Sequence, residues 1–200
     1  MLQETQDEAL RNVELTVYTD RSCINNGTEE ARVGSGIWYG NNDPQNTAIR
    51  VPGKKQTNQV GELMAILYVI RNTPGNQPLR IMSDSKFVIE GLTTYAQEWE
   101  EKDWVRIEHG TLFKCTMAWL RARTATTTLQ WVEGHSRIEG NKEADKLAAN
   151  GTWAKPERED IDLQIPADTM ITGAALTQTS QSLIYHHLTN KKCPDRVTTQ

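Results

Sequence analysis

The sequence lacks the features that mark membrane-spanning and secreted proteins. Its 200 residues contain no apolar run as long as a membrane span, and the polar start of the chain lacks the basic-then-apolar pattern of a signal peptide. It contains only three cysteines, Cys23, Cys115 and Cys193, and their odd number and wide spacing favour free thiols in a reducing compartment. We therefore expect an intracellular protein, in the nucleus or cytoplasm, that is not associated with a membrane.

An excess of basic residues is also missing. The formal net charge is -4, so any nucleic-acid partner must be bound through local patches and metal ions. A zinc site is not indicated, because His186, His187 and Cys193 lack the ligand spacing and the fourth partner that zinc requires. The composition, 37% hydrophobic and 24% charged, is instead that of an ordinary globular protein.

Apolar periodicity divides the chain into a polar tail (1–12), a core (13–151) and an appendage (152–200). Within the core, alternating or short apolar runs predict strands, and helical spacing with capping residues predicts helices. The predicted strands are 13–19, 33–39, 47–51, 79–83 and 127–132, and the predicted helices are 58–72, 84–95, 111–123 and one that ends at 151. This order indicates an α/β fold, a mixed five-stranded sheet covered by helices.

The appendage differs in character from the core. Its first part, up to residue 167, holds two prolines and little periodicity, which is typical of a linker. Residues 176–188 have apolar side chains at helical spacing, so we expect a C-terminal amphipathic helix there that serves as a docking or linking element.

Four acidic residues lie at junctions between the predicted elements. Asp20 follows the first alternating segment, Glu62 opens an apolar helical run, and Asp84 follows the short fourth strand. The fourth, Asp145, lies in the last predicted helix. Carboxylates that converge repel one another unless cations hold them, so the pattern favours a hard divalent-metal site used for phosphoryl transfer. Taken singly, Asp84 could instead cap a helix, and Glu62 could lie at a positive helix end.

Five motifs in order give the chain a family resemblance over residues 13–151. They are Tyr18-Thr-Asp-Arg-Ser-Cys23, Thr57-Asn-Gln-Val-Gly-Glu-Leu63, Ser83-Asp-Ser85, Trp131-Val-Glu-Gly-His-Ser136 and Gly140-Asn-Lys-Glu-Ala-Asp-Lys-Leu-Ala148. The sequence resembles the type 1 ribonuclease H family and, more finely, ribonuclease H domains associated with retroelement reverse transcriptases. The resemblance implies the ribonuclease H-like fold, with three antiparallel strands followed by two parallel ones. It also implies endonucleolytic hydrolysis of the RNA strand of RNA/DNA hybrids, giving 5′-phosphate and 3′-hydroxyl ends.

The same resemblance implies roles for individual residues. Asp20, Glu62, Asp84 and Asp145 match the ligands of two Mg²⁺ ions, for which Mn²⁺ can substitute, and His135 matches a loop histidine that shuttles a proton or assists product release. The positions that match substrate contacts are Asn26, Asn58 and Gln59, with Cys23 and Ser85 beside the metal ligands. Simpler roles stay open for three of these residues: Asn58 as a helix cap, Cys23 as a packed side chain and His135 as an exposed loop residue.

Two departures from the family pattern bear on activity. Arg21 stands where the family usually has glycine, which costs activity if the backbone there needs a positive φ or the substrate approaches closely. If the side chain instead faces outward, it could contact a phosphate of the substrate, and the sequence leaves both alternatives open. The segment that matches the family's basic, hybrid-binding handle is acidic here (residues 98–108), which predicts weak, salt-sensitive binding unless a reverse transcriptase or other domain supplies affinity.

These departures leave two alternatives to a monomeric hybrid nuclease. The first is a catalytically weakened domain that binds nucleic acid or protein, and the second is another nucleotidyl-transfer enzyme of the same fold, such as an integrase or exonuclease.

Overall fold

A five-stranded mixed sheet forms the centre of the molecule. The computed structural model describes residues 13–134, 137–166 and 169. The strands are β1 (Leu15–Ile24), β2 (Arg32–Trp38), β3 (Thr47–Arg50), β4 (Leu79–Ser83) and β5 (Thr127–Trp131). Their order is β3-β2-β1-β4-β5, with antiparallel pairing from β1 to β3 and parallel pairing of β1 with β4 and β4 with β5. The predicted architecture, three antiparallel strands followed by two parallel ones, is confirmed.

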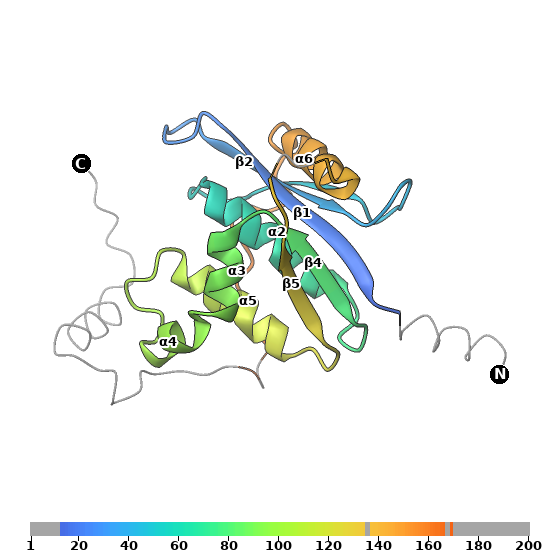
Figure 1. Cartoon of the computed structure of the whole chain (residues 1–200). Coiled ribbons are helices and arrows are strands. Elements are labelled where there is room, and N and C mark those ends of the chain that lie inside the picture. The colour runs from blue at the N-terminus through green and yellow to red at the C-terminus, as the bar shows by residue number, and fades with distance from the viewer. Residues whose placement is uncertain (1–12, 135–136, 167–168, 170–200) are drawn as a thin grey trace.

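Helices cover both faces of this sheet (Figure 1). They are α2 (Asn58–Asn72), α3 (Lys86–Thr93), α4 (Ala96–Glu101), α5 (Gly110–Arg121) and α6 (Glu139–Gly151). α2 packs on β1 and β2 and is backed by α3 and α5, whereas α6 lies on the opposite face over β1, β2 and β3. The main core fills the α2 side, with Val17, Ile37, Leu63, Ile66, Ile81 and Phe113 among its buried members. The sheet is therefore covered on both faces at β1 and β2, whereas β5 at its edge stays partly exposed.

α6 lies close to β2 because two glycines of this strand, Gly34 and Gly36, have no side chain between the strand backbone and the helix. A Cβ added to Gly34 would stand 2.1 Å from the carbonyl oxygen of Ala148, and one added to Gly36 would stand 2.0 Å from that of Ala144. Any larger residue would push the helix away, so the two glycines fix how near α6 approaches the sheet. This contact places Asp145, the residue after Ala144, above the middle of β1 and β2.

Two boundaries near the acidic residues were predicted wrongly. β1 runs on to Ile24, so Asp20 lies inside the strand instead of closing it. The register between β1 and β2 continues from Asp20↔Gly36 to Ile24↔Arg32, and this pairing overrides the polar character of residues 21–23. The second error concerns Asp84, which precedes α3 and is not in its first turn, because Ser85 caps that helix.

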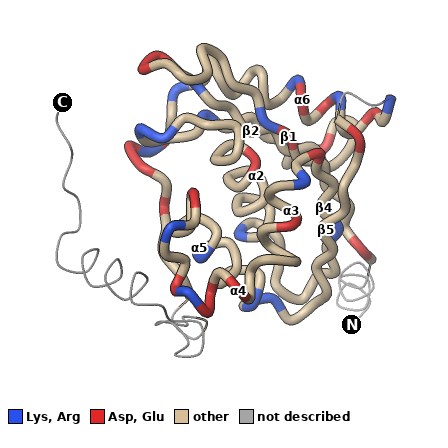
Figure 2. The backbone as a smooth tube through the Cα atoms, turned by 60° about the vertical axis from the view of Figure 1, so that its left-hand side comes forward, with Lys and Arg blue, Asp and Glu red and all other residues tan. Residues whose placement is uncertain are grey.

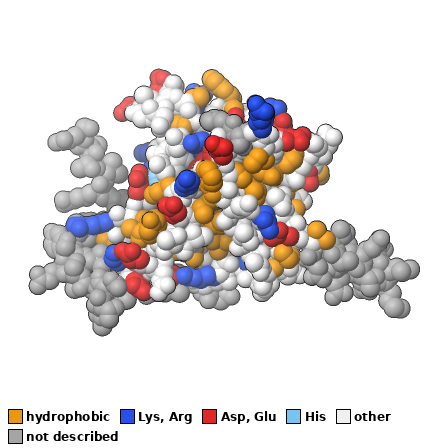
Figure 3. Space-filling view, in the orientation of Figure 1, with side chains coloured by type: hydrophobic (Ala, Val, Ile, Leu, Met, Phe, Trp, Pro, Cys, Tyr) orange, Lys and Arg blue, Asp and Glu red, His pale blue; other side chains and the backbone are white. Residues whose placement is uncertain are grey.

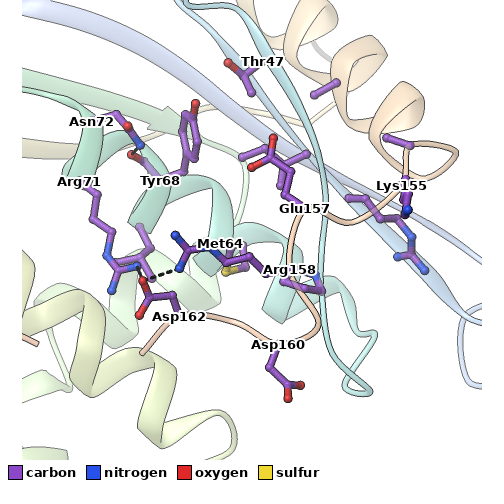
Figure 4. Close-up of a pocket in the computed structure, with 16 residues that line it drawn as sticks. Thr47, Met64, Tyr68, Arg71, Asn72, Lys155, Glu157, Arg158, Asp160 and Asp162 are labelled. Carbon is purple, nitrogen blue, oxygen red and sulfur yellow. Dashed lines mark hydrogen bonds and ion pairs between the residues drawn. The ribbon is translucent and has the colours of Figure 1, made fainter. Parts of the chain in front are cut away.

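Residues 153–166, which we call the strap, pack against the outer side of α2 and α5. The carbonyl oxygen of Gln164 accepts hydrogen bonds from Arg71 (2.8 Å) and from the Trp119 indole nitrogen (2.9 Å). Asp162 pairs with Arg71 and Arg158, and Figure 4 shows these contacts beside a cavity of about 460 Å³ between the strap, α2 and β3. The segment expected to be a linker thus adds a polar anchor to the core over its described part.

The predicted tail, residues 1–12, and the predicted amphipathic helix, residues 176–188, lie outside the described residues. Among the described residues, no helix combines the length and the apolar character needed to cross a bilayer.

Candidate active site

The pairing of β1 with β4 brings two of the acidic residues together. The last parallel partners are Thr19 and Ser83, so the next residues along the chain are Asp20, which is still in β1, and Asp84, which directly follows β4. β1 continues along β2 beyond this point while the chain leaves β4, and the two carboxylates remain side by side where the strands part. Adjacent parallel strands therefore supply the first half of the site by register alone.

α2 supplies the third carboxylate, from Glu62. The helix begins after Thr57, whose hydroxyl oxygen accepts from the backbone N–H of Val60. Gly61 lets the helix lie against the sheet, since a Cβ there would stand 2.6 Å from a methyl carbon of Val33, and the hydroxyl of Ser35 donates to the Gly61 carbonyl at 2.7 Å. These contacts turn Glu62 inward, where it is only 2% exposed.

Asp20, Glu62 and Asp84 form one carboxylate cluster. Each offers an oxygen atom, and these atoms all lie within 4.8 Å of one another. Burial, followed by the nearby charge of Asp84, raises the pKa of Asp20 to about 7. Burial and the charges of Asp84 and Asp20 likewise raise the pKa of Glu62 well above its usual value. The carboxylates are thus close enough to disfavour one another's ionisation in the absence of a cation.

Asp145 lies near this cluster but outside it. It is half-buried on α6, and its charge contributes to the raised pKa of Asp20, although less than burial and Asp84 do. Three of the four predicted ligands therefore come together, and the fourth approaches from the opposite face of the sheet.

Several residues hold the Asp84 segment in place. The Ser83 hydroxyl accepts from the Ser85 backbone N–H at 3.1 Å and donates to Glu62 at 3.4 Å. The indole nitrogen of Trp131, on β5, donates to the Asp84 carbonyl oxygen at 3.0 Å, and the Lys86 ammonium lies 4.3 Å from the centre of that indole ring. Sequence reasoning did not find this role for Trp131 and Lys86, since no local pattern indicates a contact between two strand ends.

His135 and Ser136 lie outside the described residues, so the predicted role of His135 stays a prediction. Its neighbour Gly134 does approach the cluster, because a Cβ on Gly134 would stand 2.6 Å from a carboxylate oxygen of Asp84.

The predicted substrate-contact residues are spread around the cluster. Asn26 is exposed in the turn after β1 and lines a cavity of about 510 Å³. Asn58 and Gln59 begin α2 half-buried, and Thr57 fills the capping role considered for Asn58. Ser85 caps α3 by accepting from the Val88 N–H, and the Cys23 thiol lies 3.8 Å from the Ile24 carbonyl oxygen in β1. Their contacts with a substrate stay a prediction.

Cations from α5 partly neutralise the acidic segment 98–108. Glu100 pairs with Arg121, and Asp103 pairs with Lys114, while Glu98 pairs with Lys102 at the C-terminal end of α4. Figure 2 shows acidic and basic positions interspersed around α4 and α5. Counting charge along the segment alone missed the two basic partners on α5, which come close only in the folded chain. Trp99 and Trp104 pack edge-on with each other and contact Phe113, consistent with a packing role.

A hard divalent cation fits the carboxylate cluster. The donors are all oxygen atoms, as Mg²⁺ and Mn²⁺ prefer. One oxygen of Glu62 (Oε1) and one of Asp84 (Oδ1) are buried without a hydrogen-bond partner. Buried polar atoms of this kind are costly unless a ligand satisfies them, so the geometry and the chemistry of the donors agree on a cation.

Comparison with known proteins places this geometry in a family. The family model described as RNase H matches residues 12–152. The chain belongs to the RNase H family. It is 36% identical over 140 residues to Ribonuclease H of Schizosaccharomyces pombe, covering 68% of this chain and 52% of the relative. It is 37% identical over 142 residues to Ribonuclease H1 of Homo sapiens, covering 68% of this chain and 49% of the relative. The chain thus spans about half the length of these curated relatives.

Solved structures with the RNase H fold agree with this assignment. LC9-RNase H1, a type 1 RNase H with the type 2 active-site motif, superposes with a TM-score of 0.54 at 22% identity, covering 70% of this chain and 72% of that one. The RNase H domain of PFV superposes with a TM-score of 0.54 at 24% identity, covering 69% of this chain and 93% of that one. At these identities the likeness concerns the fold.

Proposed function

We propose that this domain hydrolyses the RNA strand of RNA/DNA hybrids by an endonucleolytic, two-metal-ion reaction that leaves 5′-phosphate and 3′-hydroxyl ends. The observation that carries the proposal is the buried cluster of Asp20, Glu62 and Asp84 in a chain of the RNase H family. The catalytic domain is residues 13–151, with residues 1–12 as a tail and residues 152–200 as an appendage.

The metal site consists of Asp20, Glu62, Asp84 and Asp145, and Mg²⁺ is the proposed ion, with Mn²⁺ as a substitute. Bound divalent ions supply an activated water and stabilise the oxygen that leaves. The carboxylates of this chain determine where the scissile phosphate must lie, and the half-buried Asp84 and Asp145 are more exposed to solvent than Asp20 and Glu62. His135, which follows Gly134 beside Asp84, transfers a proton or assists product release.

Substrate binding extends from the cluster toward the start of α2. The cavity that Asn26 lines also contains Lys54, Lys55, Thr57 and His109. Glu29 and Glu108 also line this cavity and offset the charge of the two lysines. The proposed contact to a backbone phosphate therefore depends on Lys54, Lys55 and the Thr57 hydroxyl, and not on a net positive charge. Asn26, Asn58, Gln59, Cys23 and Ser85 are the proposed contacts to the hybrid, where the RNA 2′-hydroxyl both donates and accepts hydrogen bonds.

Affinity for the hybrid is expected to be modest. Figure 3 shows acidic and basic side chains interspersed over the face in view, and the net charge is -4. A foamy viral protease-reverse transcriptase, solved in complex with an RNA/DNA hybrid, has the same fold (TM-score 0.58, 20% identity, covering 69% of this chain and 20% of that one). We propose that a reverse transcriptase or another domain supplies affinity to this chain. The monomeric state and the intracellular location stay predictions.

The test is a cleavage assay with a hybrid whose RNA strand carries an end label. In Mg²⁺ the protein should release short RNA fragments with 3′-hydroxyl ends, while duplex DNA and duplex RNA should stay intact. Addition of a chelator should stop the reaction. Absence of cleavage in both Mg²⁺ and Mn²⁺, by protein that still binds the hybrid, would favour the non-catalytic binding domain. Efficient cutting of duplex DNA would indicate a different nucleotidyl-transfer enzyme of this fold.

A further inference from the structure

Arg21, the residue where the family usually has glycine, lies inside the carboxylate cluster. Its backbone belongs to β1 and is not among the described residues with positive φ, so the strand accepts a side chain there without strain. The side chain passes over Gly61, whose added Cβ would stand 2.9 Å from the Cβ of Arg21. The guanidinium therefore lies toward α2, and the arginine is not directed out to solvent.

The guanidinium contacts two of the three carboxylates. Its Nη1 atom is 3.5 Å from Oδ1 of Asp20, and its Nε atom is 3.5 Å from Oε1 of Glu62. The Arg21 side chain is 31% exposed, against 4% and 3% for the two acids. Among the described residues, Arg21 is the one cation that forms ion pairs with Asp20 and Glu62.

These contacts are electrostatic and geometrically loose. Both are longer than a usual charge-assisted hydrogen bond, and Arg21 Nε and Glu62 Oε1 each lack a hydrogen-bond partner. The guanidinium thus offsets negative charge without fully satisfying the acids. The site carries three carboxylates and one guanidinium, so a cation that binds there meets one less unit of negative charge than the carboxylates alone would present.

We propose that Arg21 is a built-in competitor for the divalent cation at Asp20 and Glu62, and that it sets the metal concentration at which the site fills. The inference rests on the proposed metal-dependent function. A metal ion that binds between these acids has to displace the guanidinium, or tolerate its positive charge at close range. In either case Arg21 weakens metal binding, and it lessens the repulsion among the carboxylates when no metal is bound.

The test is calorimetric titration of Mn²⁺ into the nucleic-acid-free protein at a pH above that at which Asp20 ionises, about 7. Arg21→Met keeps the aliphatic stem but removes the charge, and it should lower the Kd for Mn²⁺ about tenfold or more, because a unit charge at this separation is only partly screened. Arg21→Lys keeps the positive charge, so this variant should bind Mn²⁺ nearly as weakly as the parent protein does. Arg80→Met is the control for net charge, since Arg80 pairs with Glu14 outside the cluster, and it should leave the Kd unchanged.

Thermal unfolding of the metal-free protein, in the presence of a chelator, provides a second measurement. Without metal, Arg21→Met should have a lower thermal midpoint than the parent protein. Added Mn²⁺ should raise the midpoint of Arg21→Met by more than it raises that of the parent. An arginine that serves only to pack against α2 would lower the midpoint but leave the Kd unchanged, and that result overturns the inference, as does weaker Mn²⁺ binding by Arg21→Met.

The outcomes separate this inference from the proposed function. If the protein cleaves the hybrid in a metal-dependent way but Arg21→Met has an unchanged Kd for Mn²⁺, the proposed function stands. The role of Arg21 as a competitor of the metal is then rejected. Failure of both the parent and Arg21→Met to bind Mn²⁺ at millimolar concentrations would reject the competitor together with the metal site.

Discussion

Two regions beside α2 use charged side chains in opposite ways. In the carboxylate cluster, like charges are buried together, and Glu62 Oε1 and Asp84 Oδ1 have no hydrogen-bond partner. In the anchor of the strap, Arg71 meets the Asp162 carboxylate, the Gln164 carbonyl oxygen and the face of Trp119. The anchor pairs opposite charges and satisfies most of the polar groups of Arg71, although its Nε atom has no hydrogen-bond partner, so it should contribute to stability. The cluster gathers like charges and should lower stability until a ligand binds. Substitutions in the two regions should therefore affect different properties.

The largest expected effect is at the cluster. Asp84→Asn should reduce hybrid cleavage at least about 100-fold, because a neutral amide replaces a charged ligand beside the reacting phosphate. The thermal midpoint should not fall, since the change removes repulsion from Glu62 and Asp20. Cleavage rates at saturating Mg²⁺ and a thermal melt provide the two measurements.

Asp160→Asn is the matched control, because Asp160 is an exposed acid on the strap. It should leave the rate unchanged. Retention of most activity by Asp84→Asn would remove Asp84 from the site.

The reverse pattern is expected at the anchor. Arg71→Met should lower the free energy of unfolding by about 2 kcal/mol, because a partly buried ion pair and a hydrogen bond to a carbonyl oxygen are lost together. Urea denaturation measures this change, and cleavage under native conditions should stay within about twofold, since a stable fold remains mostly native. Arg80→Met, at an exposed pair, should cost less than about 1 kcal/mol. A fall in cleavage that matches the loss of stability would contradict the separation of the two regions.

The cluster should also give the metal-free protein a characteristic pH dependence. The pKa of Asp20 is raised from 3.8 to about 7, so in that interval the folded protein binds a proton that the unfolded chain does not. Stability from this group is complete below its unfolded pKa and is lost as the pH rises through about 7. In a chelator, the free energy of unfolding should therefore decrease on the order of 1–3 kcal/mol over this interval.

Comparison with Asp20→Asn separates the titration of Asp20 and of Glu62, whose pKa the charge of Asp20 helps to raise, from that of His109. His109, whose burial lowers its pKa, titrates in the opposite sense in both proteins. The parent should lose stability relative to Asp20→Asn as the pH rises. A difference that is constant with pH would show that Asp20 does not titrate as proposed.

The smallest expected effects are those of substituting two tryptophans, each of which donates an indole hydrogen bond to a backbone carbonyl oxygen. Trp131 donates to the Asp84 carbonyl oxygen, and Trp119 donates to that of Gln164, at 3.0 and 2.9 Å. Trp131→Phe should lower kcat about threefold with little change in KM, because one net hydrogen bond that positions Asp84 is lost. Trp119→Phe should lower stability by about 1 kcal/mol and leave kcat unchanged. Equal effects of the two substitutions on kcat would contradict a positioning role for Trp131.

Sequence reasoning recovered the features that depend on local pattern. Strand β4 has the predicted bounds, and the mixed five-stranded sheet was predicted from the succession of strands and helices. The meeting of Asp20, Glu62 and Asp84 was also predicted, because motifs in a fixed order specify the elements that carry them.

Features that depend on contacts between distant segments were not recoverable. Arg21 was recognised as a departure, but whether it faces in or out depends on how α2 approaches β1. The extension of β1 past Asp20 depends on pairing with β2, which residues 21–23 do not reveal on their own. The anchor of the strap depends on Arg71 and Trp119, which lie on two different helices.

The register of Thr19 with Ser83 has a consequence for how this domain tolerates changes in length. Because side chains alternate between the faces of a sheet, a single inserted residue within β4 would turn Asp84 away from Asp20 while leaving most backbone hydrogen bonds intact. The same insertion in the turn between α2 and β4, around Pro74 and Gly75, would keep the register of β4, at the cost of the hydrogen bonds that the Gly75 carbonyl oxygen accepts from Thr124 and Ala125. Insertions and deletions within β4 should thus yield folded proteins without a complete carboxylate cluster, and natural variation in length should concentrate in the turns.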